Sequence, residues 1–126
     1  MKGGIIMRVT HFEIMADDVE RATTFYQNVF GWNIEKWEGP IDYWMITTGP
    51  PETPGIDGGL MKREGPGGTV NTIEVPSVDD MMKKINGAGG KVVVPKNAVP
   101  GVGYMAYCVD TEGNMFGIME LDESAH

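Results

Sequence analysis

The sequence is poor in the side chains that bind metals and form disulfides. Its 126 residues include one cysteine, Cys108, and two histidines, His11 and His126. A disulfide within the chain, a Cys/His zinc site and a three-histidine catalytic zinc site are all excluded, because the ligands are too few. A single thiol without a signal peptide is typical of a reducing compartment, so we expect a cytoplasmic protein.

Basic residues and long apolar runs are also scarce. Lys and Arg number 10 against 18 Asp and Glu, which gives a net charge of −8 at pH 7. This charge argues against nucleic acid or an anionic membrane as a partner. No apolar run approaches the ~20 residues of a membrane-spanning helix. Hydrophobic residues still make up 41% of the chain, enough for one globular domain with a core.

The first half of the chain has the pattern of a strand, a helix and three strands. The helix carries apolar residues at helical spacing from Val19 to Phe30, with Asp17 as its predicted N-cap and Gly31 as its stop. Alternating polarity and turn residues predict strands at 8–16, 32–37, 42–48 and 58–62.

The second half repeats that order. Ser77 is the predicted N-cap of a helix whose apolar stripe includes Met81 and Met82. Strands are predicted at 69–75, 91–94, 104–110 and 114–121, and residues 95–103 are predicted to form a loop, either a lid or a plain connection. A shift of 59 positions aligns the two helices, so the chain consists of two β-α-β-β-β modules, at about residues 7–63 and 68–122.

A module of about 55 residues with one helix cannot cover both faces of its own sheet. The two modules must share a core, or their sheets must curl around a cavity, which predicts an α+β fold. Strand alternation places His11, Glu13 and Met15 on the face away from the helix. The same shift places Thr72 and Glu74 on the corresponding face. Polar groups on a mostly apolar, concave wall are typical of a small-molecule site.

Four motifs occur in an order that resembles the vicinal oxygen chelate superfamily, which includes glyoxalase I, bleomycin-resistance proteins and extradiol dioxygenases. They are Val9-Thr10-His11, the helix from Asp18-Val19-Glu20-Arg21-Ala22 through Phe25-Tyr26 to Phe30-Gly31-Trp32, Gly89-Gly90-Lys91, and Asp110-Thr111-Glu112-Gly113-Asn114. The resemblance covers residues 8 to about 122. It implies paired modules that form an open, barrel-like curved sheet around a cavity, a divalent metal that holds two substrate oxygens, and a homodimer.

The resemblance also implies four metal ligands, of which one is present. His11 matches the first position, whereas Gly59, Val70 and Gly117 stand at the other three. One imidazole does not hold a catalytic metal against water, so the usual centre is not expected. His11 and Glu13 could instead form an alternative site, with Glu74 facing them from the other module. Two carboxylates and one imidazole would suit Mg, Mn or Fe.

Without a metal, His11, Glu13 and Glu74 are candidate acid–base residues, or polar residues of a cavity wall or sheet rim. A mid-strand glycine indicates close approach to the backbone, which makes Gly117 a candidate ligand contact. The other predicted ligand-binding residues are Met15, Thr72, Met115 and Met119.

Two main functions follow. The first is a glyoxalase-related lyase or isomerase, or a dioxygenase-like enzyme, that acts on a small oxygen-rich metabolite. The second is a metal-free protein that binds and sequesters a small molecule, as bleomycin-resistance proteins do. A scaffold without small-molecule activity is a third alternative.

Overall fold

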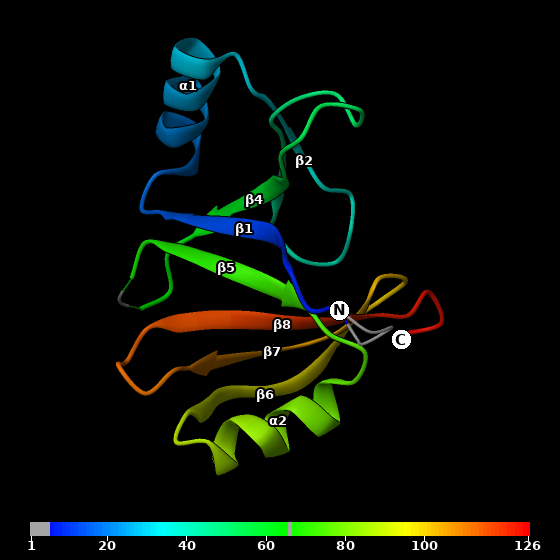
Figure 1. The fold of residues 1–126 in the computed structure, drawn as a ribbon. Coiled ribbons are helices and arrows are strands. Elements are labelled where there is room, and N and C mark those ends of the chain that lie inside the picture. The colour runs from blue at the N-terminus through cyan, green and yellow to red at the C-terminus, as the bar shows by residue number, and fades with distance from the viewer. Residues whose placement is uncertain (1–5, 66) are drawn as a thin grey trace. The chain divides into compact units, whose positions relative to one another are not determined.

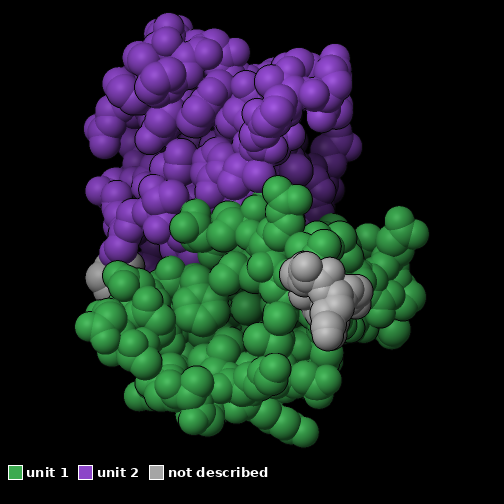
Figure 2. Space-filling view, in the orientation of Figure 1, with its two compact units in different colours: residues 1–10, 71–126 green, residues 11–70 purple. Residues whose placement is uncertain are grey.

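The predicted order of elements occurs twice along the chain. The structure is a computed structural model that describes residues 6–65 and 67–126, and these residues form an α+β fold of eight strands and two helices. They divide into two compact units, shown in Figure 2. Unit 2 comprises residues 11–70, and unit 1 comprises residues 71–126 with the described residues before His11.

The elements of the first module are β1 (Val9–Ala16), α1 (Val19–Phe30), β2 (Asn33–Lys36), β3 (Trp44–Thr47) and β4 (Asp57–Lys62). Their strand order is β2-β3-β4-β1, and Figure 1 labels β1, β2 and β4 of this set. The β1–β4 pair is parallel, and the β2–β3 and β3–β4 pairs are antiparallel.

The second module contains β5 (Thr69–Glu74), α2 (Val78–Gly87), β6 (Lys91–Val99), β7 (Gly103–Val109) and β8 (Met115–Leu121). Its strand order is β5-β8-β7-β6, again with one parallel pair, β5–β8, and two antiparallel pairs. In both modules the first strand therefore pairs with the last, which confirms the predicted repeat.

Helix α1 begins one residue later than predicted. Asp18, not Asp17, is the N-cap, and its carboxylate accepts a hydrogen bond from the Arg21 backbone N–H. Asp17 instead forms an ion pair with Arg63 at 2.9 Å. Gly31 ends the helix at a φ of 72°, a left-handed conformation that favours glycine, as predicted.

The core of unit 2 lies between α1 and one face of its sheet. Ala16, Ile34, Ile46 and Leu60 are buried there. Val19, Ala22 and Tyr26 of α1 pack against them, whereas Val29 and Phe30 at the helix end stay exposed. The apolar stripe of α1 is thus only partly covered in the part of the chain that the structure describes.

Helix α2 covers the corresponding face of unit 1. The Ser77 side chain accepts a hydrogen bond from the Asp80 N–H at the helix start, as the sequence predicts. The partly buried Met81 and Met82 pack on a core that includes Cys108 and Ile118. Glu120 of β8 also faces the helix, and its Oε1 accepts a hydrogen bond from the Val78 N–H at 2.9 Å.

The prediction of a loop at residues 95–103 is wrong for residues 95–99, and only residues 100–102 form a turn. Strand β6 continues through Pro95 to Val99 and pairs with β7, with register shifts between Val92 and Val94 and between Val94 and Asn97. β6 is the outermost strand of the order β5-β8-β7-β6. A proline is tolerated in an edge strand or at a bulge, because its missing N–H need not serve the ladder. Proline therefore does not end this strand.

No helix within residues 6–65 and 67–126 has the length and apolar character needed to cross a membrane.

Candidate functional site

The two faces of β1 have different roles. Phe12 and Ile14 pack with the buried core beneath α1. Because side chains alternate along a strand, His11, Glu13 and Met15 lie on the opposite face. The alternation predicted from the sequence is therefore confirmed for β1, and the face that carries the predicted site residues is the one that α1 leaves free.

Gly59 of β4 lies beside Glu13, its partner in the parallel register. A Cβ atom on Gly59 would overlap the hydroxyl and ring of Tyr43, the residue before β3. Partners in a parallel pair project to the same side, so the Tyr43 hydroxyl lies on the face of His11 and Glu13. The absence of a side chain at Gly59 is what admits this hydroxyl.

Tyr43 is in turn hydrogen-bonded to His11. The distance between His11 Nε2 and Tyr43 Oη is 2.6 Å, and the planes of the two rings are nearly parallel, with 17° between them. Tyr43 itself is buried. The backbone N–H of Trp37 donates to the Tyr43 backbone carbonyl at 2.7 Å, and the Trp37 ring packs edge-on against the phenol. The sheet thus holds the hydroxyl in a fixed position next to the imidazole.

Burial lowers the pKa of the His11 imidazole from its ordinary value of 6.5. The negative charges of Glu13 and Asp57 act in the opposite direction, but the loss of hydration is the larger effect. Burial consequently favours the neutral form of His11. A neutral imidazole has one ring nitrogen that can accept a proton, which is the state that a general base requires.

Two carboxylates flank this pair. Glu13 is buried, with 5% of its surface exposed. Asp57, exposed at the start of β4, is the register partner of His11, and its Oδ1 accepts hydrogen bonds from the N–H and Oγ1 of Thr48 at 2.8 and 3.2 Å. His11 and Tyr43 therefore form a hydrogen-bonded pair in unit 2, and the acidic residues Glu13 and Asp57 act on the imidazole of this pair.

The remaining predicted residues lie on one face of unit 1. Thr72 is buried and pairs in register with Gly117. A Cβ on Gly117 would lie 3.3 Å from Thr72 Oγ1 and 3.4 Å from Tyr107 Cε1, so a methyl group there needs only small shifts of its neighbours, whereas one on Gly59 would overlap Tyr43.

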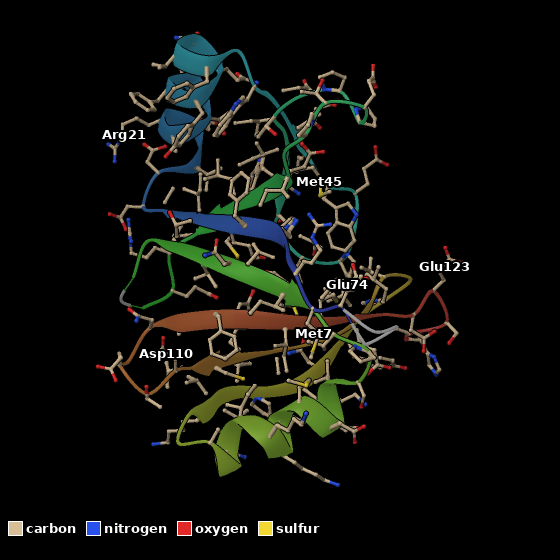
Figure 3. The ribbon with its side chains drawn as sticks, in the orientation of Figure 1. Met7, Arg21, Met45, Glu74, Asp110 and Glu123 are labelled. Carbon is tan, nitrogen blue, oxygen red and sulfur yellow. The ribbon has the colours of Figure 1, made fainter. Side chains whose placement is uncertain are left out.

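Glu74 is exposed at the end of β5, where Figure 3 labels it. Its register partner is Met119, which is half-buried, and Met115 is exposed at the start of β8. Glu13 and Glu74 thus differ, since the first is a buried carboxylate and the second a solvated one. Their roles, and those of the other predicted site residues, stay predictions.

The residues present do not fit the four-ligand metal centre that the superfamily resemblance implies. Tyr43 fills the space in which a side chain at Gly59 would begin, and it engages the Nε2 atom of His11. Val70, at the third position, is a buried apolar side chain. Within the described residues, no three His, Cys, Asp or Glu side chains gather closely enough to hold a metal ion.

The sequence reasoning missed Tyr43 and Asp57. A signal for Tyr43 was present, because a glycine in mid-strand indicates that another group approaches its backbone closely. That argument was applied to Gly117 but holds more strongly for Gly59. Asp57 had no such signal, since its position beside His11 depends on the β1–β4 register.

Comparison with known proteins supports the same fold class. A sequence family described as bleomycin resistance protein-like N-terminal matches residues 8–49. No similar sequence is found among curated proteins.

Several solved structures share the fold at low sequence identity. Methylmalonyl-CoA epimerase from Mycobacterium tuberculosis is 15% identical with a TM-score of 0.65, over 90% of this chain and 87% of that one. A methylmalonyl-CoA epimerase in complex with methylmalonyl-CoA is 13% identical with a TM-score of 0.69, over 96% of this chain and 99% of that one. A variant of the Streptomyces coelicolor methylmalonyl-CoA epimerase in complex with 2-nitronate-propionyl-CoA is 14% identical with a TM-score of 0.66, over 90% of this chain and 96% of that one.

Paired β-α-β-β-β modules, with a parallel first and last strand in each, define the class of this protein. The bleomycin-resistance-like match over residues 8–49 and the shared fold of the structural neighbours support the resemblance to the vicinal oxygen chelate superfamily.

Proposed function

We propose that this protein is a glyoxalase-related enzyme of the isomerase or lyase type, which moves a proton on a small oxygen-rich metabolite without the four-ligand metal centre. The observation that carries the proposal is the hydrogen bond between His11 Nε2 and Tyr43 Oη, next to the buried Glu13. An imidazole, a phenol and a carboxylate on one sheet face supply both a proton acceptor and a proton donor.

The reaction begins at a carbon next to a substrate carbonyl. The neutral imidazole–phenol pair takes the proton as the C–H bond breaks, and the electron pair moves into the enolate. With a 2-hydroxycarbonyl substrate, return of the proton by the same pair to the neighbouring carbon of the enediol completes an isomerisation. Departure of a neighbouring leaving group completes a lyase reaction instead. The phenol of Tyr43 keeps the imidazole in place while the proton moves.

The charges around His11 favour an uncharged carbonyl compound as substrate. Both charged groups that act on the imidazole, Glu13 and Asp57, are carboxylates. They would repel an anionic substrate such as a phosphate-bearing thioester. Several of the neighbouring solved structures are epimerases of methylmalonyl-CoA, and we take from them the proton-transfer type of reaction rather than the substrate. Glu74 stays a proposed assisting carboxylate.

The proposal is tested by proton exchange. The protein is incubated in D₂O with a panel of small 2-hydroxycarbonyl and 1,3-dicarbonyl compounds, and loss of the C–H signal is followed by NMR. We expect exchange above the buffer rate with at least one compound and its loss in His11→Gln. His126→Gln is the matched control, because His126 lies exposed at the chain end. Equal exchange in His11→Gln and the unaltered protein would refute the proposal.

A second candidate is metal-free binding and sequestration of a small molecule. It is favoured by the side chains at the second to fourth ligand positions, Gly59, Val70 and Gly117, none of which can bind a metal. The same NMR experiment separates the two functions. A sequestering protein shifts the resonances of a compound on binding but leaves its C–H protons unexchanged.

A further inference from the structure

We propose that Tyr43 is the residue that positions His11, and that Gly59, by lacking a side chain, admits the Tyr43 hydroxyl into the place where the superfamily resemblance puts the second metal ligand. In this protein His11 thus belongs to a hydrogen-bonded pair instead of a metal centre. The inference rests on the proposed function for its catalytic meaning, but its structural part stands on three contacts within unit 2.

The first contact is between the two side chains. The 2.6 Å separation of Nε2 and Oη is a short hydrogen bond, and the two ring planes are nearly parallel, with 17° between them. A bond this short restrains the rotation of the ring and biases which of its two nitrogens carries the proton, whether the phenol or Nε2 is the donor. Loss of the hydroxyl would free both.

The second contact is between Tyr43 and the backbone of Gly59. The nearest atoms to a Cβ built on Gly59 are Oη, Cζ and Cε2 of Tyr43, and all three would overlap it. Gly59 is buried within β4 and has no positive φ, so its backbone conformation does not require glycine. Space for the phenol is therefore the reason that the structure gives for a glycine at this position.

The third contact is between Tyr43 and Trp37. The backbone N–H of Trp37 donates to the backbone carbonyl of Tyr43, and the indole ring packs edge-on against the phenol. A side chain at residue 59 would consequently push on the Tyr43 ring, and Trp37 restricts the movement of that ring. A methyl group at residue 59 must break the bond to His11 or distort the strand.

A double-mutant cycle tests this arrangement without any substrate. The four proteins are the unaltered chain, Gly59→Ala, Tyr43→Ala and Tyr43→Ala/Gly59→Ala, and the readout is the set of His11 ring ¹H and ¹⁵N resonances at pH 7. These resonances report which nitrogen carries the proton, and those of His126 serve as an internal reference. Gly49→Ala is the matched control, because a Cβ there meets no atom within 4 Å.

We expect Gly59→Ala to shift the His11 resonances in the presence of Tyr43 and to leave them unmoved in the Tyr43→Ala background, since the methyl group then has space. Tyr43→Phe keeps the ring and removes only the hydroxyl, so it tests the pair even if Tyr43→Ala fails to fold. It should shift the His11 resonances and leave those of His126 in place. Unshifted His11 resonances in Tyr43→Phe, or equal effects of Gly59→Ala in both backgrounds, would overturn the inference.

The catalytic meaning is tested separately. With a compound that undergoes exchange, Tyr43→Phe should lower the maximal exchange rate at least tenfold and leave the half-saturating concentration within about twofold, which corresponds to about 1.4 kcal/mol of lost transition-state stabilisation. An unchanged rate with shifted His11 resonances would overturn the catalytic part alone. A panel without any exchange would count against the proposed function and leave the structural part intact.

Discussion

His11 and Tyr43 are separated by 32 positions in the sequence, yet their side chains meet at 2.6 Å between Nε2 and Oη. The β4 strand makes this possible, because Gly59 leaves the space that the phenol occupies. Burial lowers the pKa of this imidazole, against the charges of two neighbouring carboxylates, and the effect of a lowered pKa can be measured.

The first prediction concerns pH and stability. Because burial lowers the pKa of His11 in the folded protein, the unfolded chain binds a proton at this residue first as the pH falls below about 6.5. The contribution of neutral His11 to stability is complete above that pH and is lost as the pH falls toward the folded pKa. Urea unfolding at pH 5, 6, 7 and 8 should therefore show a steeper acid loss for the unaltered protein than for His11→Gln. The same dependence of unfolding free energy on pH in both proteins would contradict this prediction.

The second prediction contrasts two glycines in corresponding strands. Gly117→Ala should change the free energy of unfolding by less than about 1 kcal/mol, because the nearest atoms lie 3.3 and 3.4 Å from the new Cβ and alanine suits a strand better than glycine. Gly59→Ala should destabilise by about 1–3 kcal/mol, since its Cβ overlaps Tyr43. Denaturant unfolding measures both. Equal effects at the two positions would mean that the space around them does not differ.

The third prediction concerns the start of α2. Glu120→Ala removes the carboxylate that accepts from the Val78 N–H and should cost about 1 kcal/mol of unfolding free energy, as loss of a helix cap does. Glu123→Ala is the control, because Glu123 is exposed in the chain end labelled in Figure 3. It should stay within about 0.5 kcal/mol of the unaltered protein. If both variants lose equal stability, net charge rather than the cap is responsible.

The fourth prediction concerns the turn between β7 and β8, where Figure 3 labels Asp110. Its Oδ1 accepts hydrogen bonds from the N–H groups of Glu112 and Asn114 at 2.8 and 2.9 Å, and these bonds lower the pKa of the carboxyl. Asp110→Ala should lower Tm, and Asp110→Asn, which keeps an oxygen acceptor, should lower it less. The contribution of the ionised carboxylate should fade as the pH falls below about 3.8. An equal Tm for Ala and Asn would contradict this role.

Much of the fold could be predicted because its signals are local. The Ser77 cap, the Gly31 stop and the alternation of β1 each depend on residues a few positions apart. The repeat extended these signals from one module to the other. Strand β6 was cut short at Pro95 because a proline ends most strands, and its tolerance here depends on an edge position that emerges only in the assembled sheet.

The candidate site could be predicted only in part for the same reason. His11 and Glu13 follow from alternation along one strand. Tyr43 and Asp57 join them through the register of β4 with its neighbours, and that register is not encoded in any short sequence pattern. The exposure of Glu74 likewise depends on where β5 ends. The expected homodimer and the alternative metal site of His11 with Glu13 stay predictions.

The most direct test of the account is proton exchange measured on protein treated with excess chelator. With a compound that exchanges, the account predicts the same rate before and after EDTA, no gain on addition of Mg, Mn, Fe, Ni or Zn, and loss of exchange in His11→Gln but not in His126→Gln. Exchange that disappears with EDTA and returns with a metal ion would contradict the account, because His11 would then act through a metal rather than through Tyr43.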